Sequence, residues 1–197
     1  MSADPSRDNG RSAPVPLPTG LLGMKLLILA LSMLFAASVF GFLVIRARAT
    51  AWPPPGVPSL PGTLWISTLI ILLSSVTMET AVRAARGDRQ GALRTGMLLT
   101  SLLGAAFLVS QTLNWFALVA AHLTAKTNLY GFTFYMLTGL HAAHVIGGLV
   151  PLAVVTVRAF RDRYSPVAFA GVVYTAFYWH FLTAVWLVLF TILMVSS

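Results

Sequence analysis

Four histidines and one carboxylate are the side chains whose types and spacing could support chemistry within long apolar segments. The histidines are His122, His141, His144 and His180, and the acid is Glu79. His141 and His144 are three residues apart, so they lie on neighbouring parts of one helix face. His144 and His180 each lie ~14 residues from one end of their apolar segments, which corresponds to ~21 Å along a helix. Two histidines level on adjacent helices could ligate a haem iron.

A second interpretation of the same histidines is structural. Neutral imidazoles inside a membrane commonly hydrogen-bond to hydroxyls of other helices, and Thr138, Tyr178 and Thr183 are the candidates here. Ion or proton handling is a third possibility. The spacing favours hydrogen-bonded packing and leaves haem ligation open.

Glu79 is followed by Arg83 at i+4, which puts both side chains on one helix face. This pattern predicts a local ion pair within reach of the headgroups. The other acids lie outside the apolar segments, at Asp4, Asp8, Asp88 and Asp162. Because no second carboxylate is expected at membrane depth, we do not expect a self-contained proton pathway.

The composition identifies a membrane protein. The chain has 197 residues, of which 57% are hydrophobic and 9% charged, so charge is too scarce to cover a water-soluble surface. The formal net charge is +8, but the basic residues lie between apolar runs and do not form a nucleic-acid-binding face. The absence of cysteine excludes disulfides and thiolate metal sites.

Five apolar runs are each long enough to cross a ~30 Å hydrocarbon layer as a helix. We expect an all-α integral membrane protein, with a disordered tail at 1–20 and a five-helix membrane domain at 21–197. The last helix should begin at Pro166, with Ser165 as its N-cap. The expected transmembrane spans are about 21–45, 63–85, 92–121, 130–157 and 166–195.

The orientation follows from the basic residues beside the spans. One side carries Arg7, Arg11, Lys25, Arg83, Arg86, Arg89, Arg94, Arg158, Arg161 and Arg163. The other side carries only Arg46, Arg48 and Lys126. This asymmetry predicts a cytoplasmic N-terminus and a periplasmic C-terminus.

Several ordered motifs between Trp65 and Phe190 carry a family resemblance. They are LSSVT at 73–77, GDR at 87–89, TSLLGAAFLVSQ at 100–111, FYMLTGLHAAHVIGG at 134–148, and YWHF at 178–181 followed by VW at 185–186. Together they resemble subunit III of the haem-copper oxidases, which include cytochrome c and quinol oxidases. The length and the five spans match the short bacterial form of this family.

The resemblance implies a non-catalytic subunit of aerobic respiratory electron transport in a bacterial inner membrane. Such a subunit packs against subunit I and accompanies subunit II; haems and copper belong to the partners, and this chain would hold no cofactor. The histidines would then serve in hydrogen-bonded packing. The expected structural intramembrane polar residues are Glu79, Arg83, His141, His144, Trp179, His180 and Trp186.

The resemblance also implies bound phospholipid. In the family, basic residues at the positions of Arg158 and Arg161 reach lipid phosphates held in a cleft between helices. Guanidinium groups suit phosphate oxygens at the inner interface. The alternative for both arginines is that they only set the topology.

Three departures separate this chain from the family pattern. Ser32, Asn114 and Thr183 stand where the family often has intramembrane acids. A divergent branch, such as the subunit-III-like protein that accompanies nitric oxide reductases, is therefore a second candidate. A small b-type cytochrome that uses His144 and His180 is a third. A transporter is disfavoured because neither broken helices nor a repeated half is visible.

Overall fold

The structure is a computed structural model that describes residues 19–166 and 168–196. This part of the chain forms five α-helices, each long and apolar enough to cross a membrane, which confirms the expected all-helical membrane class. The helices are α1 (Thr19–Arg48), α2 (Thr63–Arg86), α3 (Gln90–Ala120), α4 (Leu129–Phe160) and α5 (Ala170–Val195).

The helix boundaries agree with the expected spans at most ends. Of the tail expected at 1–20, residues 1–18 lie outside the described residues, and Thr19 and Gly20 already belong to α1. Helix α4 starts at Leu129, where the side chain of the N-cap residue Asn128 accepts a 2.8 Å hydrogen bond from the Gly131 N–H. Its last turn contains Arg158, which the sequence pattern had placed just beyond the span.

The expected start of the last helix is wrong. Ser165 and Pro166 do not cap α5, which begins at Ala170 with Phe169 as its N-cap residue. The Ser165 carbonyl instead accepts the Ala168 N–H at 3.0 Å in a turn. The apolar character of this segment reflects packing of the connection, since Phe169 contacts the main core cluster.

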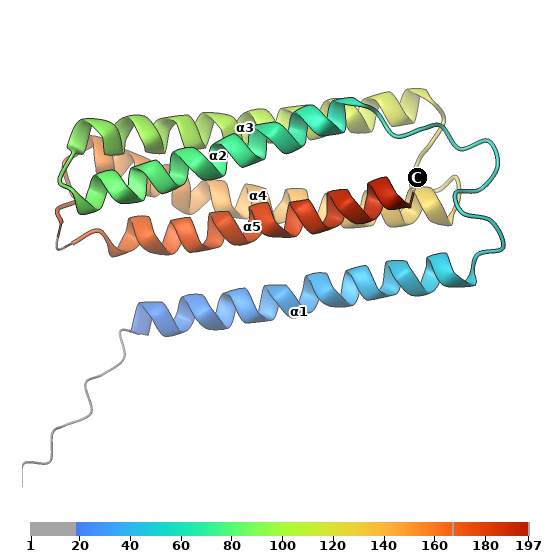
Figure 1. Ribbon diagram of the computed structural model, residues 1–197, viewed down its shortest axis with the longest axis horizontal. Coiled ribbons are helices and arrows are strands. Elements are labelled where there is room, and N and C mark those ends of the chain that lie inside the picture. Colours follow the sequence, from blue (N-terminus) through green and yellow to red (C-terminus); the bar gives the residue numbers. More distant parts are fainter. Residues whose placement is uncertain (1–18, 167, 197) are drawn as a thin grey trace, which may run out of the picture.

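Helices α2, α3, α4 and α5 form a ring in which each helix packs against two neighbours, and α1 lies outside it against α5 and α4 (Figure 1). The first helix begins at one end of the bundle and α5 ends at the other. Small residues permit close approach within the ring. A Cβ added at Gly96 of α3 would lie 2.9 Å from the Ala81 Cβ of α2.

Candidate functional site

Two tryptophans of α5 cross the centre of the ring and bind α2. Trp179 Nε1 donates to Ser74 Oγ at 2.8 Å, and Trp186 Nε1 donates to Thr68 Oγ1 at 3.0 Å. Both indoles are buried. A Cβ at Gly104 of α3 would lie 2.7 Å from the Trp179 ring, so α3 leaves the space that this indole occupies. The indoles therefore connect α5 to α2 through hydrogen bonds that lipid could not replace.

His141 of α4 is enclosed by aromatic rings. Its ring centroid lies 5.7 Å from that of Phe107 on α3, 5.2 Å from that of Trp186 on α5 and 6.3 Å from that of Phe35 on α1. The side chain is fully buried, and neither ring nitrogen has a hydrogen-bond partner among the described residues. His141 thus occupies a packing position shared by four helices.

His144 and His180, the pair whose spacing suggested haem ligation, face different helices. His144 Nδ1 donates to the Leu140 carbonyl at 2.7 Å, and its ring lies 5.2 Å from that of Phe35 on α1. His180 Nδ1 instead lies 2.6 Å from Ser75 Oγ on α2. The structure does not bring the two imidazoles together around one site.

The prediction that Thr138, Tyr178 or Thr183 hydrogen-bonds to a histidine ring is wrong. Tyr178 Oη donates to the backbone carbonyl of His144, at 3.1 Å, and not to its ring. Thr138 accepts from Trp115 Nε1 at 3.2 Å, and Thr183 donates to the carbonyl of Trp179. Single-helix spacing could not separate these hydroxyls from Ser75, because the choice depends on how α2 and α5 are rotated against each other.

Glu79 and Arg83 form an ion pair on α2, with Arg83 Nε 2.8 Å from Glu79 Oε1. The second carboxylate oxygen, Oε2, lies 3.8 Å from His180 Nε2 on α5. Sequence reasoning anticipated the i, i+4 pair but missed His180 and Ser75 beside it. The LSSVT motif was the signal that could have found them, since it places Ser75 one turn before Glu79.

Arg158 joins two openings near one end of the bundle. A groove of about 740 Å³ runs between α1, α4 and α5, with Leu27, Val150 and Tyr174 among its walls and Arg158 at its end. A second, more polar pocket of about 430 Å³ is lined by Arg158, Arg161, Arg163 and Tyr164. Burial raises the pKa of the Tyr164 hydroxyl above its usual value, and the positive charge of Arg158 opposes this rise. The phenol therefore stays neutral beside the arginines at pH 7.

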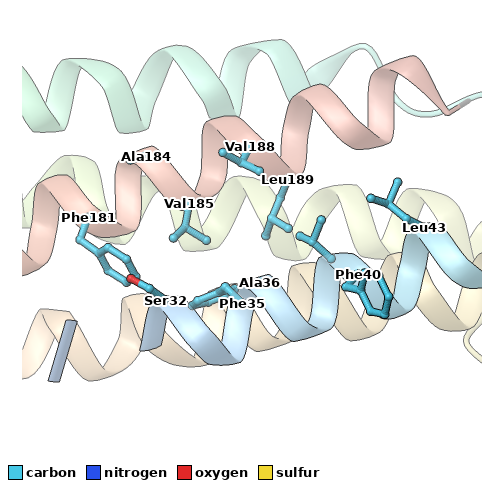
Figure 2. Close-up of a pocket in the computed structure, with 11 residues that line it drawn as sticks. Ser32, Phe35, Ala36, Phe40, Leu43, Phe181, Ala184, Val185, Val188 and Leu189 are labelled. Carbon is cyan, nitrogen blue, oxygen red and sulfur yellow. The ribbon is translucent and has the colours of Figure 1, made fainter. Parts of the chain in front are cut away.

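A further groove of about 530 Å³ separates α1 from α5 (Figure 2). Its walls are almost entirely apolar, and Phe35 and Phe181 close one end, with ring centroids 6.5 Å apart. Ser32 also lines this groove, with its hydroxyl donated to the Ile28 carbonyl at 2.7 Å.

The other two positions that depart from the family pattern are buried and hydrogen-bonded. Asn114 Nδ2 donates to Ser67 Oγ at 3.1 Å, and the Thr63 hydroxyl donates to Asn114 Oδ1. Thr183 donates to the Trp179 carbonyl at 3.1 Å. The replacements therefore make neutral hydrogen bonds within the bundle.

The described residues contain no group of three or more His, Cys, Asp or Glu side chains placed to hold a metal ion. Their polar side chains within the helices mainly contact neighbouring helices. Arginines line a pocket at one end of the bundle. These features define a multi-pass helical membrane protein whose described polar side chains mainly join neighbouring helices.

Comparison with known proteins identifies the family. The family model described as cytochrome c oxidase subunit III matches residues 14–197. The chain belongs to this family.

Three relatives carry the corresponding name. Cytochrome c oxidase subunit 3 of Corynebacterium diphtheriae is 40% identical over 126 residues, which cover 64% of this chain and 61% of that protein. A probable cytochrome c oxidase subunit 3 of Mycobacterium tuberculosis is 34% identical over 84% of this chain and 82% of its own length. The subunit 3 of Synechocystis is 33% identical, covering 86% and 72%.

Proposed function

We propose that this chain is the non-catalytic subunit III of a haem-copper terminal oxidase in a bacterial inner membrane. It packs against subunit I, and subunit II completes the assembly, while electrons and protons move through those partners. The observation that carries the proposal is the direction of the intramembrane polar groups: Trp179, Trp186 and His180 each engage another helix of the same chain. These contacts join α5 to α2 and support a role in packing.

Copurification tests the proposal against the nitric oxide reductase alternative. The names of the relatives favour an oxidase. We expect the affinity-tagged chain, extracted from its native membrane, to bring with it a copper- and haem-containing complex that consumes oxygen. Recovery of a copper-free complex that reduces nitric oxide would support the alternative, and recovery of the chain alone would contradict both.

The proposed orientation places the N-terminus in the cytoplasm and the C-terminus in the periplasm. The α2–α3 and α4–α5 connections then face the cytoplasm together with Arg86, Arg89, Arg161 and Arg163. The α1–α2 and α3–α4 connections, which carry few basic residues, face the periplasm. This arrangement satisfies the positive-inside rule.

The groove that ends at Arg158 is the proposed phospholipid site. Its apolar walls suit an acyl chain, and the pocket lined by Arg158 and Arg161 suits a phosphate at the headgroup level. We expect the Arg158→Ala/Arg161→Ala double variant of the complex to retain less phospholipid in native mass spectrometry, with an unchanged haem spectrum.

Arg89→Ala provides the matched control, because Arg89 carries the same charge at the same end of the bundle but lies in the α2–α3 connection. The control should keep its lipid. Equal lipid content in the double variant and the unmodified complex would reject the site.

A further inference from the structure

A strip of polar side chains lies on the outside of the bundle along the seam between α2 and α5. We define this polar strip as Ser75, Glu79 and Arg83 of α2 with His180 of α5. Ser75 Oγ lies 2.6 Å from His180 Nδ1, His180 Nε2 lies 3.8 Å from Glu79 Oε2, and Glu79 Oε1 pairs with Arg83 Nε at 2.8 Å. Figure 1 shows α2 and α5 side by side along this seam. The strip runs inward from the arginine-rich end of the bundle.

The inner part of the strip lies two to three helical turns from the nearer ends of α2 and α5. Glu79 is seven residues before Arg86, the last residue of α2, which corresponds to ~10 Å along the axis. His180 is ten residues after Ala170, the first residue of α5, or ~15 Å. Even so, the Glu79 side chain is 44% exposed and that of His180 is 37% exposed. Acyl chains against this surface would leave polar atoms unsatisfied in hydrocarbon, which is costly.

The strip also has an unused hydrogen-bonding capacity. Glu79 Oε1 accepts from Arg83, but the 3.8 Å separation between Oε2 and His180 Nε2 is too long for a hydrogen bond. Ser75 engages the opposite nitrogen of the same imidazole and so holds the ring in place. Glu79 Oε2 is therefore positioned to accept a donor from outside the chain.

The surroundings of the strip have the form of a small protein-binding surface. Glu79 and His180 line a pocket of about 180 Å³ together with Val173, Ala176 and Phe177 of α5. Large apolar side chains stand around it, with Phe177 52% exposed and Val76 60% exposed. A polar centre inside an apolar rim allows close helix packing and one central hydrogen bond. The outer face of α1, by contrast, presents apolar side chains such as Leu29 and Met33, which acyl chains can cover.

We propose that the polar strip is the docking surface for a membrane-spanning helix of another chain of the oxidase complex, and that this helix places a hydrogen-bond donor against Glu79 Oε2. The inference rests on the proposed function, since it requires a partner in the membrane. It goes further by assigning the α2–α5 seam to that partner and by specifying a donor side chain on the partner helix.

Site-specific photo-crosslinking in the assembled complex tests the surface directly. A benzophenone amino acid at Phe177 lies at the rim of the pocket, and the same label at Phe116, which is 66% exposed on α3, serves as the control. We expect illumination in native membranes to give a protein adduct between this chain and a different subunit from position 177 and little from position 116. Adducts with lipid alone, with a second copy of this chain, or with equal yield at both positions would overturn the inference.

A second experiment tests the proposed hydrogen bond. We expect Glu79→Leu to lower the fraction of complex that keeps this subunit during detergent extraction by about three- to tenfold, the range of one interhelical hydrogen bond in a membrane. Asp88→Asn, which removes an acid in the α2–α3 connection, is the control and should have no effect. Circular dichroism of the isolated variant verifies that it folds. Full retention of a folded Glu79→Leu subunit would contradict the role of Glu79.

The docking surface and the proposed function can be rejected separately. If the unmodified chain copurifies with an oxidase but the label at Phe177 meets no partner, the docking surface is wrong and the proposed function stands. If the chain copurifies with no respiratory subunit, the proposed function fails first.

Discussion

Indole N–H groups and small residues act together in the centre of this bundle. The Trp179 ring, which donates to Ser74, packs directly on Gly104 of α3, and Tyr178 packs in the same way on Gly148 of α4. In a membrane, where apolar burial does not drive helices together, such close contacts and hydrogen bonds supply the specificity of packing. The identity of single glycines therefore decides whether the tryptophans find their partners.

Gly104→Ala tests this dependence. The added Cβ would lie 2.7 Å from two atoms of the Trp179 ring and 3.0 Å from Leu149 Cδ2, so a large ring must move. We expect a loss of about 1–3 kcal/mol in the free energy of unfolding, the usual effect of overpacking. Thermal denaturation or unfolding in mixed detergent of the purified chain measures it.

Gly139→Ala is the matched control on α4, because an added Cβ there meets no atom within 4 Å. Alanine also favours helix by up to about 1 kcal/mol over glycine. The control should be neutral or slightly stabilising. Equal effects at the two positions would show that backbone propensity, and not the contact with Trp179, governs the result.

The sequence could predict a polar pair within one helix, but not the partners of polar side chains on other helices. Glu79 and Arg83 were paired correctly because both lie on one helix, where spacing fixes the geometry. The partner of His180 depends on the rotation of α5 against α2, so Ser75 was missed. His141 shows the same limit, since nothing in its spacing predicts enclosure by rings from three other helices.

Helix α1 differs from the other four in how it is held. Only 11% of its most apolar window is buried, against 33–39% for α2 to α5. Grooves open along it toward both α4 and α5. Phe35 and Phe42 are the buried aromatic side chains of α1, and the Phe35 ring lies 5.2 Å from that of His144 on α4 and 6.5 Å from that of Phe181 on α5. The position of α1 thus depends on few side chains.

Phe35→Ala should release α1 from the ring. Truncation of a buried phenylalanine costs about 3–5 kcal/mol in a well-packed core, and acyl chains that enter the gap would recover part of this. Because the chain has no cysteine, spin labels can be placed at Leu29→Cys on α1 and Phe177→Cys on α5 alone. We expect a broader distance distribution between the labels in the Phe35→Ala background.

Phe40→Ala is the control on the same helix, since Phe40 is 69% exposed whereas Phe35 is 4% exposed. It should leave the distribution unchanged. Broadening of similar extent in both variants would indicate that α1 is held by its general apolar surface rather than by Phe35.

The start of α5 shows what hydropathy cannot predict about a single helix. Hydropathy predicts the existence and approximate length of each span, because a single segment in lipid can pair all its backbone N–H and C=O groups only as a helix. It does not distinguish a helical residue from an apolar connection that packs on the bundle. Phe169 belongs to the second class, and the predicted start of the helix at Pro166 was wrong for that reason.

For the whole molecule, the arrangement of histidines is what separates a packing subunit from an electron carrier. Ligation of one iron by His144 and His180 would require α4 and α5 to rotate relative to each other. That rotation would break the hydrogen bond from Tyr178 to the His144 carbonyl and the bond from Trp179 to Ser74. The helix packing and a bis-histidine haem are therefore alternatives.

We accordingly expect the chain purified free of partners to show no Soret absorption. In the assembled complex, His144→Ala should leave the haem spectrum unchanged, because the Nδ1 hydrogen bond of His144 ends on the Leu140 carbonyl and its ring packs on Phe35. Absorption spectroscopy and iron analysis of both preparations measure this. Stoichiometric iron in the isolated chain, with a Soret band that disappears in His144→Ala, would identify a b-type cytochrome and end the assignment of this bundle as a packing subunit.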